Sequence, residues 1–279
     1  MGKKTSVGNW IGAVVVVLAV LVAGAYLAHK AMHPGAPTSA PATPATEASA
    51  ALATRAPIQH PIDQAGSNPA GASAAALPSL DDSDASVAAA LASLAGGRDL
   101  SSLLVSRQVV ARIVATVDAL PRHGGLAPFT LPARTPKGSF ITTATEGTTV
   151  IGEKNSARYA PYMQILEATD PQALASWYVH SYPLFQEAYR QLGYPQGYFN
   201  DRLIVAIDNL LAAPDPTQPP ELVESKTYYH YADASLESLS TGQKLMLRVG
   251  PVNEAKIKVK LRAIRAQLVN AKPPQTSQG

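Results

Sequence analysis

Three residues have the side chains that general acid–base catalysis requires and lie in segments with helical periodicity: His180, Asp201 and Asp208. Asp201 and Asp208 are two helical turns apart, so a helix would place them on one face. Asp208 follows Ile207 in an apolar pattern, where a carboxylate either acts as a general base or pairs with an arginine. Structural pairing is the favoured interpretation, and the sequence assigns no catalytic residue.

Charged residues within apolar segments are the candidates for such pairing. Asp118 stands between Val117 and Ala119, and it could either meet an arginine or cap a neighbouring helix. The candidate buried polar residues are Asp208, Arg202, Arg158 and Asp118.

Motifs with established chemistry do not occur in this sequence. It has no glycine-rich phosphate loop, no G-x-S-x-G, no H-E-x-x-H and no S-x-x-K. It has no cysteine, which excludes disulfides, thiolate metal sites and a cysteine nucleophile. His180 and Glu187 are two turns apart, too far to share a metal through helix geometry alone. We therefore expect no metal and no cofactor, and a net charge of +3 is too small to indicate nucleic acid.

Tyrosines are concentrated in the second half of the chain, with ten of the eleven between Tyr159 and Tyr231. Flat rings with a polar edge give large contact areas in glycan and peptide recognition. Tyr228, Tyr229 and Tyr231 are the candidates for a ligand groove. Tyrosine also fills ordinary helix–helix interfaces, and that alternative stays open.

A basic segment lies near the carboxyl end. Between Lys244 and Arg265 there are seven Lys or Arg residues and one acid, Glu254. Lys256 and Lys260 share a helix face, and with Arg265 they could meet anionic lipid headgroups or an acidic wall polymer. A solvated face on a terminal helix is the commoner meaning of such a pattern.

The amino-terminal segment indicates the cellular location of the protein. Lys3 and Lys4 precede an uninterrupted apolar run that begins at Trp10 and ends at Ala28, long enough to cross a bilayer as a helix. A cleaved signal peptide is the alternative, because Ala23-Gly24-Ala25 has the pattern of a cleavage site. A signal anchor is favoured, since apolar residues continue beyond that site. Residues 1–9 would be a cytoplasmic arm and residues 10–29 the transmembrane segment.

Composition divides the rest of the chain into three parts. Residues 30–79 are rich in Ala, Pro, Thr and Ser and predict a disordered linker. Residues 80–270 have recurring large aliphatic residues and predict one globular domain. Residues 271–279 form a polar tail.

The globular part reads as mainly α-helical with one small β-hairpin. Helices are predicted from the acidic residues at 81–82 to Ala95, over 100–120, from Asn155 to Leu166, and from Asp170-Pro171 to Leu192 with a kink or break at Pro183. Further helices are predicted from a cap at Asn200 to about Leu211, at 235–239 and 243–249, and from Asn253 to Val269. Strands at 140–143 and 148–151, joined through Glu146-Gly147, form the expected hairpin, and residues 228–231 are extended.

Four segments carry a family resemblance: VATVDALPR (114–122), NSARYAPY (155–162), YPLFQEAYRQLGYPQGYFNDRLIVAIDNLLAAP (182–214) and YADASLESLSTGQKLMLRVG (231–250). Together they resemble the bacterial family of membrane-anchored proteins catalogued as domain of unknown function 3014. The resemblance implies the layout of anchor, spacer and domain, and it implies no activity, cofactor or catalytic residue.

The sequence thus predicts a single-pass protein of the bacterial inner membrane with its carboxy-terminal domain in the periplasm. Its expected role is non-catalytic binding or scaffolding in the cell envelope, with a protein or a wall polymer as partner. The alternative is an envelope hydrolase that acts on cell-wall material through His180, Asp201 or Asp208. The sequence does not indicate an oligomeric state.

Overall fold

The computed structural model describes residues 57–62, 77–124, 126, 130–145, 147–225 and 228–269. The predicted cytoplasmic arm, the predicted anchor with Trp10 and Ala28, and the polar tail lie outside these residues. Within the described ranges, no helix combines the length and apolar character needed to cross a membrane.

Helices make up most of the described structure, and several of them begin at a side-chain cap. Asp170 caps one helix by accepting a hydrogen bond from the backbone N–H of Ala173 at 2.7 Å. Ser240 and Gln243 form a capping box at the start of another. The helices are α2 (Asp84–Leu94), α3 (Val109–Ala119), α4 (Ala160–Ala168), α5 (Pro171–Gln191), α6 (Phe199–Leu211), α7 (Ala234–Glu237), α8 (Thr241–Val249) and α9 (Pro251–Val269), with the 3-10 helix η3 (Glu153–Tyr159) directly before α4.

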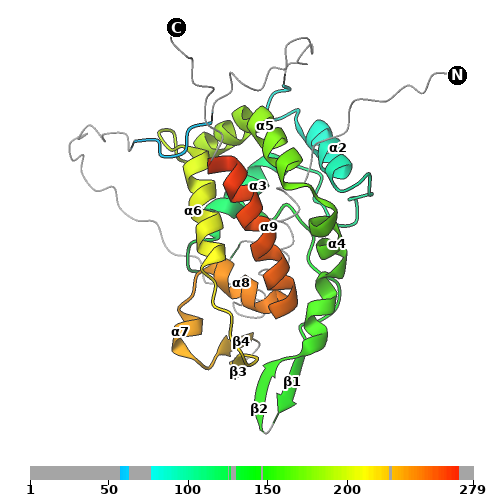
Figure 1. Cartoon of the computed structure of the whole chain (residues 1–279), viewed down its shortest axis with the longest axis vertical. Helices are drawn as coiled ribbons and strands as arrows, with labels where there is room; N and C mark the ends of the chain where they lie inside the picture. The colour runs from blue at the N-terminus through cyan, green and yellow to red at the C-terminus, as the bar shows by residue number, and fades with distance from the viewer. Residues whose placement is uncertain are drawn as a thin grey trace, which may run out of the picture.

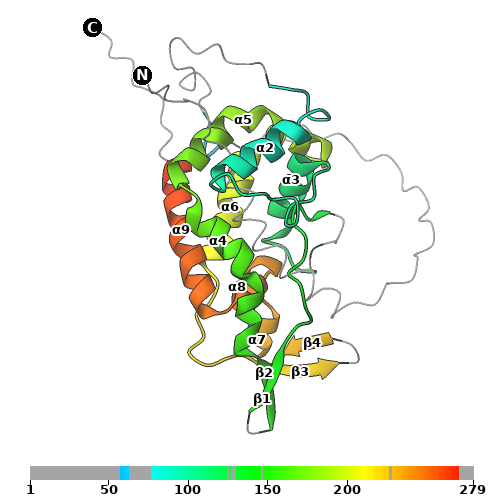
Figure 2. The same ribbon diagram turned by 90° about the vertical axis from the view of Figure 1, so that its right-hand side faces the viewer.

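A four-stranded antiparallel sheet lies at one end of the helical part, together with α7 (Figures 1 and 2). Its order is β1 (Thr142–Thr145), β2 (Thr148–Ile151), β3 (Glu221–Ser225) and β4 (Tyr228–Tyr231). The predicted hairpin is present as β1 and β2, but it is only half of the sheet. β3 was not predicted, because its strand character comes from pairing with β2 and β4 rather than from its own short segment.

The hydrophobic core lies between α3, α5, α6, α8 and α9. Aromatic rings from α5 and α6 meet at its centre, where Phe185 and Phe199 stack with 5.9 Å between centroids. Tyr178 is fully buried and packs edge-on against Phe185 at 5.2 Å. The tyrosines of α5 are therefore part of the hydrophobic core. This agrees with the alternative that tyrosine fills helix–helix interfaces.

Several predicted helix boundaries differ from those observed, and two of the differences have a clear physical reason. The helix expected over 100–120 begins only at Val109, because the carboxylate of Asp84 accepts hydrogen bonds from the N–H groups of Gln108 and Val109 at 2.7 and 2.8 Å. Of the predicted kink or break at Pro183, the break is wrong, since α5 continues through Pro183 to Gln191. Pro183 lies on the exposed side of α5, while Leu184 and Phe185 are buried and hold the helix against the core.

Part of the segment predicted as a disordered linker is in contact with the domain. Residues 57–62 form hydrogen bonds with Tyr198, Asn200 and Asp201 at the start of α6. The segment of residues 30–79 as a whole has few large apolar residues, and these hydrogen bonds are mostly made by backbone groups of residues 57–62, so composition alone could not indicate them.

Candidate ligand-binding cleft

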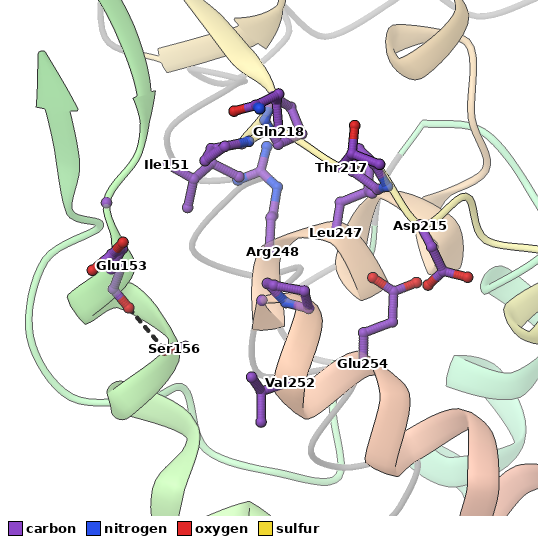
Figure 3. Close-up of a pocket in the computed structure, with 16 residues that line it drawn as sticks. Ile151, Glu153, Ser156, Asp215, Thr217, Gln218, Leu247, Arg248, Val252 and Glu254 are labelled. Atoms are coloured by element: carbon purple, nitrogen blue, oxygen red, sulfur yellow. Dashed lines mark hydrogen bonds between the residues drawn. The ribbon is translucent and has the colours of Figure 1, made fainter. Parts of the chain in front are cut away.

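A cleft of about 460 Å³ opens where the sheet meets the helices (Figure 3). One wall is the junction of β2 and η3, the second is the loop of residues 215–220, and the third is the junction of α8 and α9. This volume lies in the range of pockets that take small molecules or short peptides. The lining residues are Ile151, Gly152, Glu153, Ser156, Asp215, Pro216, Thr217, Gln218, Pro219, Pro220, Leu247, Arg248, Gly250, Pro251, Val252 and Glu254.

The helix turn between α8 and α9 shapes the cleft. Gly250 ends α8 with a φ of 87°, a conformation that side chains disfavour. A Cβ at this position would also lie 3.0 Å from the Cβ of Ser156 on the opposite wall. The glycine thus brings the start of α9 and η3 close together.

Arg248, in the last turn of α8, forms the end of the cleft that faces the sheet. Its side chain extends between Ile151 and Gln218 in Figure 3, and the residue is only 3% exposed. The guanidinium lies over the rings of Phe140 and Tyr231, with 5.4 and 5.8 Å from Cζ to the centroids. Two aromatic faces around a desolvated cation hold it in a fixed orientation. Burial raises the pKa of Tyr231, and the positive charge of Arg248 opposes that rise.

An acidic group forms the other end. Glu254 and Asp215 point toward one another in Figure 3, and both are held by the buried ammonium of Lys258. Lys258 Nζ lies 3.0 Å from Glu254 Oε1 and 2.7 Å from Asp215 Oδ1, and it donates a 2.7 Å hydrogen bond to the carbonyl of Ala213. Burial raises the pKa of Glu254, and Lys258 acts against that shift.

The predicted tyrosine groove does not coincide with this cleft. Tyr231 is buried beneath Arg248, and Tyr229 is half-buried against Phe140 with 6.0 Å between centroids. The side chain of Tyr228 lies outside what the structure describes. Tyr231 therefore supports the cleft from behind, and its ring is not among the lining residues.

The three predicted basic residues of α9 lie along one side of the domain and each contacts a neighbouring element. Lys256 pairs with Glu167 at 2.5 Å, and Lys260 donates to the carbonyl of Thr169 at 2.5 Å. Arg265 forms a two-bond pair with Asp208, at 2.5 and 2.9 Å. These contacts join α9 to α4 and α6.

The predicted polar residues are paired, in combinations that the sequence did not specify. Asp118, whose side chain is 10% exposed, meets Arg202 at 2.9 Å and Arg122 at 2.7 Å. Asp208 instead pairs with Arg265 at a half-exposed position. The guanidinium of Arg158 binds Asn155 and the backbone carbonyls of residues 136–138.

The residues of the hydrolase alternative do not converge on the cleft. His180 is exposed on α5, Asp201 accepts backbone hydrogen bonds at the start of α6, and Asp208 pairs near its end. None of them lines the cleft. In the part of the chain that the structure describes, no group of three or more His, Asp and Glu side chains is arranged to hold a metal.

The residues at the two ends of the cleft were not predicted, although a signal existed for each. Arg248 falls between buried Leu247 and Val249 in the short apolar helix α8. Glu254 and Lys258 are four residues apart on the α9 face that buries Ile257 and Leu261. A charged residue whose helical spacing places it on the buried face of a helix is the pattern that would have identified Arg248, Glu254 and Lys258.

The fold and the site together define a mainly helical domain with a small sheet and a ligand-sized cleft at their junction. The family described as "Protein of unknown function (DUF3014)" matches residues 109–265, more than half of the chain, so the chain belongs to this family. This match confirms the family membership indicated by the four sequence segments, while the bacterial source and the membrane anchor stay predictions. No curated protein and no solved structure matches the chain.

Proposed function

We propose that this chain is a single-pass protein of the bacterial inner membrane whose periplasmic domain binds, without catalysis, a short peptide segment in the cleft. The observation that carries the proposal is the charge arrangement of the cleft, with the cation of Arg248 at one end and, at the other, the carboxylate of Asp215, whose side chain is 74% exposed. A peptide backbone supplies both kinds of polar group, with carbonyl oxygens for the cation and N–H groups or amines for the carboxylate.

The walls between these ends favour a peptide over a wall glycan. They are made largely of proline and aliphatic residues, including Pro219, Pro251 and Val252. Sugar rings are usually bound on aromatic faces, and no Phe, Trp or Tyr is among the lining residues. A partner protein of the envelope is therefore the proposed source of the ligand.

The chemistry of the cleft favours binding over hydrolysis. Glu254 is the lining carboxylate with a raised pKa, but it is 2% exposed and lies 3.0 Å from the Lys258 ammonium. A general acid needs to reach the substrate, and this carboxylate is occupied by an ion pair within the protein. The envelope hydrolase remains the alternative, and hydrolysis of wall fragments that Glu254→Gln abolishes would favour it.

Peptide selection tests the proposed binding. A displayed random-peptide library is selected on the purified full chain and counter-selected on Val252→Glu, which places a charge at the mouth of the cleft. Val252 is 68% exposed, so this substitution spares the core. We expect the selection to enrich peptides that bind the wild type and do not bind Val252→Glu. Enriched peptides that bind both proteins equally would contradict the proposal.

The location is tested separately. Carbonate extraction followed by intact-mass measurement should return the full-length chain in the membrane fraction. A product without the first 25 residues or so, released into the soluble fraction, would contradict the tether.

A further inference from the structure

We propose that Tyr198, Asn200 and Asp201 form a peptide-binding site that the chain's own linker, residues 57–62, occupies in cis. This site lies at the opposite end of α6 from the loop that forms one wall of the cleft. The proposal is independent of what the cleft binds.

Backbone groups of the linker carry most of the contact. The Asp201 carboxylate accepts hydrogen bonds from the N–H groups of Gln59 and His60, the latter at 2.7 Å. The N–H of Ile62 donates to the Tyr198 hydroxyl at 2.7 Å. In return, Asn200 Nδ2 donates to the carbonyl of His60 at 2.8 Å. A carboxylate that accepts successive backbone donors gives charge-assisted bonds, which are stronger than neutral ones.

Contacts with the core, and not only with the linker, hold the shape of the site. Gln186 of α5 donates to the carbonyl of Gly197 at 2.8 Å and accepts from the N–H of Phe199 at 2.9 Å. The ring of Tyr198 lies 5.4 Å from that of Tyr182, centroid to centroid. These contacts fix the turn that presents the three binding residues, so the site is preformed for a ligand.

Asn200 gives a second indication of a binding site. The residue is completely buried, and its Oδ1 has no hydrogen-bond partner among the described residues. A buried acceptor normally finds a donor. The site thus offers one acceptor more than residues 57–62 use, which a peptide with a further N–H donor could satisfy.

The ligand class follows from the resident segment. It is a short peptide outside helix and strand, with Pro57 before the bound donors, Pro61 between them, and an aliphatic residue, Ile62, packed against the core. Proline limits the conformations of the free peptide and so lowers the entropy lost on binding. A partner segment of the same kind would compete with the linker.

Competition in trans tests the proposal. The triple variant Gln59→Pro/His60→Pro/Ile62→Pro removes the three linker N–H donors and changes no residue of the domain. A fluorescein-labelled peptide of residues 55–64 is then titrated into the full chain. In the wild type the linker competes at an effective concentration in the millimolar range. We expect the triple variant to bind the peptide at least tenfold more tightly than the wild type does.

Two controls locate the binding. Gln59→Ala/His60→Ala keeps every backbone donor and should behave as the wild type. Asp201→Asn added to the triple variant should weaken peptide binding at least fivefold, while Val252→Glu at the cleft should leave it unchanged. Equal binding to the wild type and the triple variant, or no effect of Asp201→Asn, would overturn the proposal.

A distance measurement in the full chain gives an answer even if the free peptide binds weakly. The chain has no cysteine, so Pro57→Cys with Val205→Cys supplies a unique pair for spin labels, and Val205 is 48% exposed on α6. We expect a narrow distance distribution that the triple proline substitution broadens. A broad distribution without that substitution would show that the linker is not bound.

Discussion

The guanidinium of Arg248 lies over the ring of Tyr231, with 5.8 Å from Cζ to the ring centroid. Phe140 lies 5.4 Å from the same cation, so two aromatic rings hold one buried charge at the end of the cleft. Arg248 comes from α8, Tyr231 from β4 and Phe140 from the segment before β1. This contact therefore joins the sheet to the helices and also orients the cation that a ligand would meet.

Arg248→Lys keeps the charge but loses the flat guanidinium that stacks on the two rings. We expect the free energy of unfolding to fall by about 1–3 kcal/mol, since cation–π contacts are strongest when desolvated. Urea denaturation measures this loss. Arg190→Lys is the matched control, because Arg190 is exposed and its pair with Glu187 should be worth less than about 0.5 kcal/mol. Equal stability of the two variants would show that the stacking contributes little.

Asp118→Asn leaves Arg202 and Arg122 without their carboxylate. Asp118 also accepts from the Tyr194 hydroxyl at 3.3 Å, so several groups lose a partner at a largely buried position. We expect a loss of about 2–4 kcal/mol in denaturant unfolding. Asp208→Asn breaks a half-exposed pair with Arg265 and should cost less than about 1 kcal/mol. A larger loss for Asp208→Asn would reverse our ranking of the two pairs.

Glu254 and Glu237 should affect stability with opposite dependence on pH. Burial raises the pKa of Glu254 in the folded state, so the folded protein keeps this proton to higher pH than the unfolded chain. The contribution of Glu254 to stability therefore falls as pH rises above about 4.5, its ordinary pKa. Burial also opposes ionisation of Glu237, but hydrogen bonds from Lys244 and the N–H of Tyr231 outweigh it and lower its pKa. Its contribution is complete above pH 4.5 and is lost as pH falls below that value.

Unfolding free energies at pH 3–7 for the wild type, Glu254→Gln and Glu237→Gln check these signs. The stability of the wild type relative to Glu254→Gln should decrease from pH 4.5 to 7. Relative to Glu237→Gln it should instead increase from pH 3 to 4.5. The same direction for both variants would contradict the assigned environments.

Gly242 packs so closely against its neighbours that they would have to move to admit a side chain. A Cβ there would lie 2.7 Å from Leu210 Cδ2 and 3.1 Å from the carbonyl oxygen of Leu120. We expect Gly242→Ala to destabilise the domain by about 1–3 kcal/mol, through overpacking between α8 and α6. Leu210→Ala removes the nearest atom, so the double variant should lose less stability than the sum of the two single losses. Simple additivity would mean that the clash is relieved elsewhere.

Local signals predicted the parts of the fold that depend on a few neighbouring residues. Asp170-Pro171 starts α5 as expected, and Gly147 takes a φ of 83° in the predicted hairpin turn. Asn200 was expected to cap α6, but the helix begins at Phe199 and Asn200 holds the carbonyl of His60 instead. An asparagine side chain can cap a helix or bind the backbone of a distant segment, and the sequence did not show which of the two Asn200 does.

The cleft could not be predicted because its walls come from segments far apart in the chain. Ser156 on η3 and Gly250 after α8 are neighbours only in the folded protein, and β3 forms only by pairing with β2 and β4. The order of residues in the sequence did show that charged residues occur within apolar segments. Which charges meet, as in Arg265 with Asp208, depends on helix packing and was found only in the structure.

The most direct test of the proposed function is the affinity for the cleft of a peptide selected on the wild type before any counter-selection on Val252→Glu. Isothermal titration compares the wild type with Val252→Glu and with Val259→Glu, a matched change at another exposed valine of α9 that does not line the cleft. We predict a dissociation constant at least tenfold higher for Val252→Glu and within twofold of the wild type for Val259→Glu. Equal binding by the wild type and Val252→Glu would contradict the assignment of the cleft as the binding site.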